Sequence, residues 1–393
     1  MVTVYWKAGA SGNASTVANW NTALDGSGTD QAPATGDDVI FAQGGNCTWD
    51  IAGATAIPNS ITLATGYTGT VTQGDVDISI GAGGYSQAAG RFTGSSNWVI
   101  CQGGFAHTGG VLSAGKPNLE MSGNDTTLRL SDYDKIGKLK ITGERVNFQA
   151  PVNGCEVDGV FTNTGSVVLS GTFNLPTHLL SASTIGNISG TGTLSFRYYN
   201  TNATIPAMTI TCNLKIWSLD ISTQNGTLTL GGAVSCNGLE VSSAHATYTI
   251  TLDLAGFNLT ARGITVGTRG VLLGGEGVIR NYGNFDSSAG ALDAGTSQYV
   301  QAGPGTIKLA AGQSLNDLIV RSAAAGSALA SNVTVNGIYA HVPDLIQGAY
   351  SLTYNKDTEY TGKRRPLRKR IVKRVVWPSL ADKELLEDLE AAP

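Results

Sequence analysis

Hydrophobic and polar residues alternate over short stretches along most of this chain. Stretches such as 226–230 (GTLTL), 249–254 (TITLDL) and 305–309 (GTIKL) have an apolar residue at every second position, and Gly, Asn or Ser clusters separate them. Because alternate side chains of a β-strand point to opposite faces, this period predicts strands of about five residues with one buried face. No ten-residue stretch between residues 40 and 355 has a helical period, so the crossover helices of an α/β sheet are not expected.

An apolar-x-x-apolar-x-apolar pattern recurs along the chain, and an Asn-Gly pair follows each clear copy. The apolar positions are Ile136, Leu139 and Ile141; Ile216, Leu219 and Ile221; Leu315, Leu318 and Val320; and, in a looser copy, Ile57, Ile61 and Leu63. The Asn-Gly pairs begin at Asn153, Asn237 and Asn336, which are 84 and 99 residues apart. This spacing indicates a repeating unit of about 80 to 100 residues that contains several shorter turns of chain.

The composition favours a coil that stacks on itself. Gly supplies 52 of the 393 residues and charged residues only 14%, which disfavours long helices and suits short strands joined by tight turns. In a β-solenoid, the backbone groups of each turn pair with the next turn, about 4.8 Å away. We therefore predict an all-β protein with a parallel β-solenoid (β-helix). An array of β-sandwich domains is the alternative, although the chain lacks a clear sandwich Trp or tyrosine corner.

The first 50 or so residues differ from the repeats. They contain Trp6, Trp20 and Trp49 together with Tyr5 and Phe41. Since the open end of a solenoid exposes unpaired strand edges, we expect these aromatic residues to cover the first turn. The predicted organisation is an N-terminal capping region at 1–56, a solenoid body at 57–357 and an extended and helical C-terminal tail at 358–393.

The cysteines favour free thiols over a metal site, and a disulfide is an alternative that their spacing does not support. Cys47, Cys101, Cys155, Cys212 and Cys236 are widely spaced and form no CxxC or metal-ligand pattern, so we expect buried free thiols. The sequence contains neither a run of eighteen apolar residues nor the pattern of a secretory leader. It therefore predicts a soluble protein that is made without export and has no membrane contact.

One motif spans the first 41 residues: YW, a Gly-rich stretch, ANW, and then P-x-x-x-D-D-V-x-F. Its positions are Tyr5, Trp6, Asn19, Trp20, Pro33, Asp37, Asp38, Val39 and Phe41. This motif resembles the start of β-helical proteins of tailed bacteriophages and of some repeat-rich bacterial surface proteins, and residues 214–266 are similar to the body of the same group. The resemblance implies a β-helical fold and a virion setting. It implies no catalytic residues, because the shared motifs are structural.

Paired carboxylates are the candidate catalytic groups, because some polysaccharide-cleaving phage tailspikes are also solenoids. Glycoside cleavage needs two carboxyl groups about 5 to 9.5 Å apart. The candidate acids between Glu120 and Asp158 include Asp132, Asp134, Glu144, Glu156 and Asp158. On strands, Asp132 with Asp134 and Glu156 with Asp158 can share a face. Such pairs also arise by chance on an acidic surface, and we interpret them as a solvated face.

The remaining candidates carry weaker signals. His107, His178, His245 and His341 are too far apart in sequence to suggest a local metal site, and we expect them at the surface or at elbows. Asp75 and Asp77 are too few for a calcium loop, and we interpret them as a solvated strand face. The stretch 196–200 (FRYYN) is either a sugar-stacking patch or a strand whose alternate aromatics pack inward, and we prefer the second. No cofactor is expected.

The C-terminal tail has a different composition from the body. Residues 363–374 hold eight of the 25 basic residues, whereas residues 375–393 carry five acids and one Lys. The β-branched part suits a strand added to a partner's sheet edge, and the part after Pro378 suits a short helix with an apolar stripe. The predicted partner-docking residues are Arg368, Arg370, Ile371, Val372, Val375, Val376, Trp377, Leu385, Leu386 and Leu389. The alternatives are a solvated flexible tail and nucleic-acid contact by the basic run, which the acidic body disfavours.

Together these observations predict a non-enzymatic structural protein of a tailed phage particle. We expect it on the virion surface, as a head decoration or fibre or as a tail fibre, docked through its tail to capsid or tail proteins and made in the host cytoplasm. Analogy with the resembling group also implies self-association as a homotrimer. The alternatives are a tailspike-like protein that binds or cleaves a host-surface glycan, and a bacterial surface adhesin.

Overall fold

The computed structural model confirms the expected all-β class and the parallel β-solenoid. It describes residues 1–112, 115–151, 153–218, 222–321, 324, 326–341, 345–354 and 359–361. Apart from strands, these residues form two short 3-10 helices, η1 (Val17–Asn19) and η2 (Thr177–Ala182). The chain divides into two compact units: unit 1 is Met1–Ala203 with Met208–Lys215, and unit 2 is Thr204–Ala207 with Ile216–Pro393.

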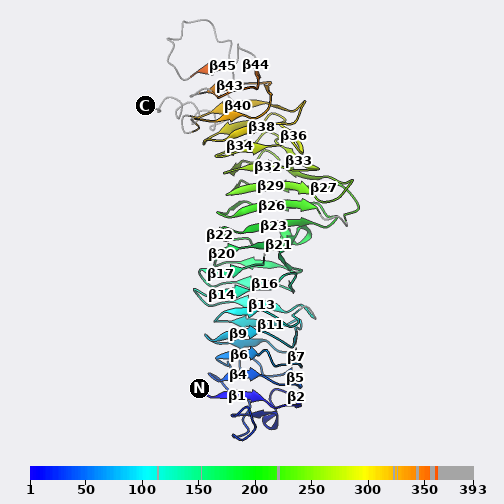
Figure 1. Cartoon of the computed structure of the whole chain (residues 1–393), viewed down its shortest axis with the longest axis vertical. Helices are drawn as coiled ribbons and strands as arrows, with labels where there is room; N and C mark the ends of the chain where they lie inside the picture. The colour runs from blue at the N-terminus through cyan, green and yellow to red at the C-terminus, as the bar shows by residue number, and fades with distance from the viewer. Residues whose placement is uncertain are drawn as a thin grey trace. The chain divides into compact units, whose positions relative to one another are not determined.

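Unit 1 is a stack of turns whose strands form four sheets, named A to D here (Figure 1). Sheet A contains, in spatial order, β22 (Asn187–Gly190), β20 (Ser166–Ser170), β17 (Val146–Gln149), β14 (Thr127–Arg129), β12 (Phe105–His107), β9 (Gly84–Gln87), β6 (Ser60–Leu63), β4 (Asp38–Phe41), β1 (Thr3–Trp6) and β3 (Trp20–Asn21). Sheet B contains β10 (Arg91–Thr93), β7 (Thr70–Gln73), β5 (Asn46–Trp49) and β2 (Ser11–Asn13). Sheet C contains β19 (Phe161–Asn163), β16 (Leu139–Ile141), β13 (Asn118–Met121), β11 (Trp98–Cys101) and β8 (Ile78–Ile80). Sheet D contains β15 (Lys135–Ile136), β18 (Cys155–Val157), β21 (Thr172–Pro176) and β23 (Thr193–Tyr198).

The strands that belong to unit 2 also form four parallel stacks, and these parts of the sheets are named E to H here. Sheet E contains β27 (Gly226–Leu230), β30 (Ile250–Asp253), β33 (Gly270–Leu273) and β36 (Ala291–Asp293). Sheet F contains β28 (Val234–Cys236), β31 (Leu259–Ala261), β34 (Val278–Asn281), β37 (Gln298–Gln301), β40 (Asp317–Val320), β43 (Tyr339–His341) and β45 (Glu359–Thr361). Sheet G contains β39 (Ser314–Leu315), β42 (Val333–Val335) and β44 (Leu352–Tyr354), and sheet H contains β29 (Gly238–Ser243), β32 (Ile264–Val266), β35 (Phe285–Asp286), β38 (Thr306–Lys308) and β41 (Ala328–Leu329). The strands β24 (Ala203–Ile205), β25 (Met208–Thr209) and β26 (Asn213–Ser218) come from the stretch of sequence where the units divide.

One turn of the coil takes about 20 to 24 residues, the sequence separation of typical side-chain hydrogen bonds between neighbouring turns. Parallel pairing in register places equivalent side chains above one another: Val39 pairs with Ile61, Ile61 with Tyr85, and Tyr85 with Phe105. All four of these side chains are buried. The period of two thus gives each strand an inward face, and stacking joins these faces into one continuous core.

The recurring apolar pattern marks inward positions. Ile136, Leu139 and Ile141 are fully buried, and so is Ile216, whereas Leu219 and Ile221 lie outside the described residues. Each copy of the pattern supplies inward residues to two neighbouring sheets, because it continues from one short strand into the next. Ile136 lies in β15 of sheet D, and Leu139 and Ile141 lie in β16 of sheet C. The long unit of about 80 to 100 residues therefore contains several turns.

The predicted aromatic cap is formed by Trp20 of β3, whereas Phe41 and Trp49 lie at inward positions of β4 and β5 and belong to the core of the first turns. Trp20 packs edge-on against Trp6 with ring centroids 4.9 Å apart, and its Nε1 donates a 2.7 Å hydrogen bond to the carbonyl of Ala14. The strand β3 pairs antiparallel with β1 on the side away from β4, so it covers the free edge of sheet A. The stacked turns begin at β1, within the stretch predicted as the cap.

Candidate functional site

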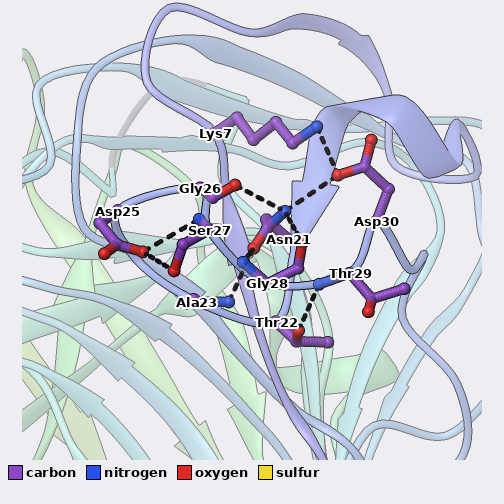
Figure 2. Close-up of polar contacts among 10 residues, drawn as sticks. All are labelled: Lys7, Asn21, Thr22, Ala23, Asp25, Gly26, Ser27, Gly28, Thr29 and Asp30. Atoms are coloured by element: carbon purple, nitrogen blue, oxygen red, sulfur yellow. Dashed lines mark hydrogen bonds and ion pairs between the residues drawn. The ribbon is translucent and has the colours of Figure 1, made fainter.

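The start motif builds the capped end of unit 1. Asn21 is buried, and its amide holds the loop that follows: Nδ2 donates to the Gly28 carbonyl at 3.1 Å and to Asp30 Oδ1 at 2.9 Å, while Oδ1 accepts from the Ala23 and Gly28 N–H groups, both at 2.9 Å. Lys7 Nζ lies 2.7 Å from Asp30 Oδ1, and Figure 2 shows these groups converging on Asn21. Hydrogen bonds from Lys7 and Asn21 lower the pKa of Asp30. The loop thus satisfies its polar groups internally.

The two acids of the motif, Asp37 and Asp38, accept hydrogen bonds from groups in the N-terminal segment and in the next turn. Asp37 Oδ1 accepts the N–H of Val2 at 3.0 Å, and its Oδ2 accepts from Gln31 Nε2 at 3.0 Å. Asp38 Oδ1 accepts from Ser60 Oγ at 2.6 Å and Asn59 Nδ2 at 2.8 Å, one turn further on. These bonds clamp the N-terminus and the first two turns, which is a structural role for the paired acids.

The prediction of a solvated face is wrong for Asp134. Its Oδ2 lies 2.6 Å from His107 Nδ1, and both side chains are buried. Asp134 is buried because of the register of the stacked turns. His107 occupies an inward position of β12, two residues after the buried Phe105, and Asp134 lies next to it in the following turn. Asp132 is exposed, as predicted, and its Oδ2 accepts from Asn153 Nδ2 at 2.9 Å. The pair Asp132 and Asp134 therefore does not share a face.

The solvated-face prediction is also wrong for Glu156. This residue is only 6% exposed, although it points outward from β18 between the inward Cys155 and Val157. Its Oε2 lies 2.6 Å from Arg197 Nη1, and its Oε1 accepts from the Tyr199 hydroxyl at 2.9 Å. Burial raises the pKa of Tyr199; the hydrogen bond with Arg197 opposes this shift, and the nearby Glu156 charge adds to it. The phenol therefore stays protonated and donates to the carboxylate.

The other acids contact cations or solvent. Asp158 forms an ion pair with Lys116, and Glu120 lies 3.0 Å from Lys140 Nζ. Glu144 is exposed, and so are Asp75 and Asp77, as expected for a solvated face. The members of the pair Glu156 and Asp158 are thus held by different partners.

The aromatic stretch FRYYN packs as we preferred. Phe196 and Tyr198 point inward and are fully buried, whereas Arg197 and Tyr199 form the ion-pair cluster with Glu156. His178 is exposed beside Tyr199, with ring centroids 6.3 Å apart. Sequence reasoning missed this polar cluster, because Glu156 and Arg197 are 41 residues apart. The signal available in the sequence was Arg197, a charged residue between the inward aromatic residues Phe196 and Tyr198 of one strand, which needs an acidic partner on the outer face.

The histidine prediction holds for two of four residues. His178 is exposed, and His245 lies at an elbow, where its Nδ1 accepts the Thr247 N–H at 2.8 Å. His107 and His341 are buried, contrary to the prediction, because both occupy inward positions of strands. The stacked ring of Tyr339 lies 4.5 Å from that of His341.

The cysteine prediction is confirmed: all five thiols are free and buried. In the part of the chain that the structure describes, no group of three or more His, Cys, Asp or Glu side chains is arranged to hold a metal ion. None of the described helices has the length and hydropathy to cross a membrane. The predicted docking residues, from Arg368 to Leu389, lie outside the described residues.

Comparison with known proteins finds no family model, no curated protein and no solved structure that matches the chain.

Proposed function

We propose that this chain is a non-enzymatic structural protein of a tailed phage particle, displayed on the surface of the head or tail. It is made in the host cytoplasm and attaches to other virion proteins through residues 363–393. The observation that carries the proposal is the capped end. The motif residues that resemble phage β-helical proteins are the ones that pack Trp6 on Trp20 and clamp the first turns through Asp37 and Asp38.

The chemistry of the described acids supports a structural role. Asp134, Glu156 and Asp158 each contact a basic partner, and Asp38 accepts two hydrogen bonds from the next turn. A carboxylate held by an arginine and a phenol, as Glu156 is, is poorly suited to donate a proton to a leaving group. These acids stabilise the stack of turns.

Incorporation into particles tests the attachment. The full-length variant carrying Val372→Asp and Val376→Asp removes two apolar residues of the proposed docking strand and keeps the basic run. We expect it to be as folded as the wild type by circular dichroism and absent from purified particles. Thr229→Asp, an outward position of β27, is the matched control and is expected to be incorporated normally. Normal incorporation of the Val372 and Val376 variant would overturn the attachment.

Incubation with host polysaccharide tests the alternative of a glycan-cleaving spike. We expect no new reducing ends from the wild-type chain. Their appearance, and their loss in Glu156→Gln, would replace the structural proposal with an enzymatic one.

Light scattering tests the proposed trimer, for which we expect three times the 40.5 kDa mass of the chain.

A further inference from the structure

The outer face of sheet F contains an apolar column where the strands β37, β40 and β43 stack. Val300 pairs with Ile319, and Ile319 with Ala340, so the three side chains lie above one another. Each follows an inward residue, Tyr299, Leu318 or Tyr339, and therefore points outward. Val300, Ile319 and Ala340 are nevertheless only 0%, 2% and 5% exposed. An outward position of a solenoid is normally open to solvent, so this column is covered.

These residues form a hydrophobic cluster of their own. Val300, Ile319 and Ala340 cluster with Ala302, and Val278 and Ile338 pack at the edge; these six residues are called the outer patch below. Of the described elements, only the neighbouring strands of sheet F contact β37, β40 and β43 extensively. The described part of the fold therefore supplies no helix or strand that lies over the outer patch.

The same column is polar in the preceding turns. Thr260 pairs with Arg280, and Arg280 with Val300, so the chemistry of the column changes between β34 and β37. Arg280 lies at this border. Its Nε is shielded from solvent and has no hydrogen-bond partner among the described residues. A shielded guanidinium N–H favours an acceptor, and an acidic side chain is the strongest one.

The chain itself carries a segment of matching chemistry. Residues 379–392 (SLADKELLEDLEAA) combine an apolar stripe of Leu385, Leu386 and Leu389 with five acidic residues. A helix of this length is marginal alone in water and gains stability from an apolar surface. An apolar patch with an arginine at its border complements an acidic amphipathic helix in both hydrophobicity and charge.

The segment also starts close to the patch. The last described strand, β45, pairs with β43 in sheet F and ends at Thr361. From there β40 is two turns away, or about 10 Å at about 4.8 Å per turn. The linker 362–378 spans up to about 55 Å when extended, which is enough to reverse direction and lay the helix across all three strands.

We propose that residues 379–392 of the same chain dock as a helix on the outer patch, with Leu385, Leu386 and Leu389 against Val300, Ile319 and Ala340 and the acidic side toward Arg280. This inference goes beyond the proposed function, and it narrows the part of the tail that meets a virion partner to residues 363–378, because Leu385, Leu386 and Leu389 are then occupied within the chain. The basic run and the strand before Pro378 then form an exposed loop between β45 and the docked helix, available to a partner.

A disulfide trap tests the contact in the full-length chain. Ile319→Cys with Leu386→Cys should form a cross-link within one chain under mild oxidation, identified by peptide mapping and by migration as a monomer. Thr229→Cys with Leu386→Cys is the matched control and should remain uncross-linked. A cross-linked dimer would show that a second copy of the chain covers the outer patch. The absence of a cross-link would indicate that another protein covers it. Either result overturns the proposal.

A second variant avoids reliance on the introduced thiols. Glutamyl endopeptidase cleaves after Glu384, Glu387 and Glu390, and a docked helix protects these bonds. We expect Ile319→Glu to accelerate this cleavage about tenfold at every protein concentration and Thr229→Glu to leave it unchanged. Equal cleavage rates in the wild type and Ile319→Glu would overturn the docking while leaving the virion attachment untouched.

Discussion

The hydroxyl of Tyr299 donates a 2.6 Å hydrogen bond to Oε1 of Gln301, two residues further along β37 and inside the core of unit 2. The Gln301 amide in turn donates to the carbonyls of Gly283 and Gly303 at 2.9 and 2.7 Å. Unit 1 contains the same arrangement, in which Tyr85 donates to Gln87 at 2.8 Å. Each unit thus uses a Tyr-x-Gln pair to satisfy polar groups in a core of stacked apolar side chains.

Removal of the Gln301 amide should be costly. Gln301→Leu removes three hydrogen bonds from the interior and leaves the Tyr299 hydroxyl without its acceptor, whereas the Gly283 and Gly303 carbonyls keep donors in Asn281 and Ser327. A lost hydrogen bond costs about 0.5 to 1.5 kcal/mol, and a buried group left unsatisfied costs about 1 to 3 kcal/mol. We expect the free energy of unfolding, measured with urea, to fall by about 2 to 4 kcal/mol. Thr251→Val, at an outward position of β30, should change it by less than about 0.5 kcal/mol. A similar fall in the free energy of unfolding of both variants would contradict a stabilising role of the Tyr299–Gln301 pair in the core.

The close approach of backbone between neighbouring turns explains part of the glycine content, because a Cβ has no room at these positions. A Cβ at Gly143 would meet the carbonyl oxygen of Gly123 in the previous turn, and a Cβ at Gly165 would meet that of Gly143. We expect Gly143→Ala to destabilise the protein by about 1 to 3 kcal/mol, because the turns must separate locally. A Cβ at Gly263 would lie 3.7 Å from its nearest neighbour, an ordinary contact, so Gly263→Ala should be nearly neutral. Thermal unfolding of the two variants gives the comparison.

The thiols should be inert in the native protein. Burial raises the pKa of Cys101 to about 12 and that of Cys212 to about 11, and it raises those of Cys47 and Cys155 further. Since the thiolate is the reactive form, we expect almost no reaction with Ellman's reagent at pH 8. All five thiols should react in denaturant. Rapid reaction of one equivalent in the native state would show that a thiol is accessible.

The contribution of Asp38 should depend on pH. Hydrogen bonds from Ser60 and then Asn59 lower its pKa in the folded protein. A lowered folded pKa contributes stability above the unfolded value of about 3.9, and this contribution is lost as the pH falls through the folded pKa. We therefore expect Asp38→Ala to lower the urea midpoint at pH 7 and to have a smaller effect at pH 2.5. Glu276→Ala, outside these hydrogen bonds, is the control, and an equal effect of Asp38→Ala at both pH values would refute the linkage.

The local pattern of the sequence determined the strands and their inward faces. Ile136, Leu139 and Ile141 are buried as their spacing predicts, and Phe196 and Tyr198 point inward as alternation requires. The aromatic cap followed from the concentration of Trp near the N-terminus. These features depend on which face of a strand a residue occupies, and a period of two specifies that face without knowledge of neighbouring turns.

The tertiary structure decided which residues meet between turns. His107 and Asp134 are 27 residues apart and pair in the interior, and Glu156 meets Arg197 across 41 residues. Such contacts depend on the exact length of every intervening turn, which varies by several residues, so no local pattern fixes them. The covered position of Val300 was equally invisible, because alternation specifies that a side chain points outward but not what lies over it.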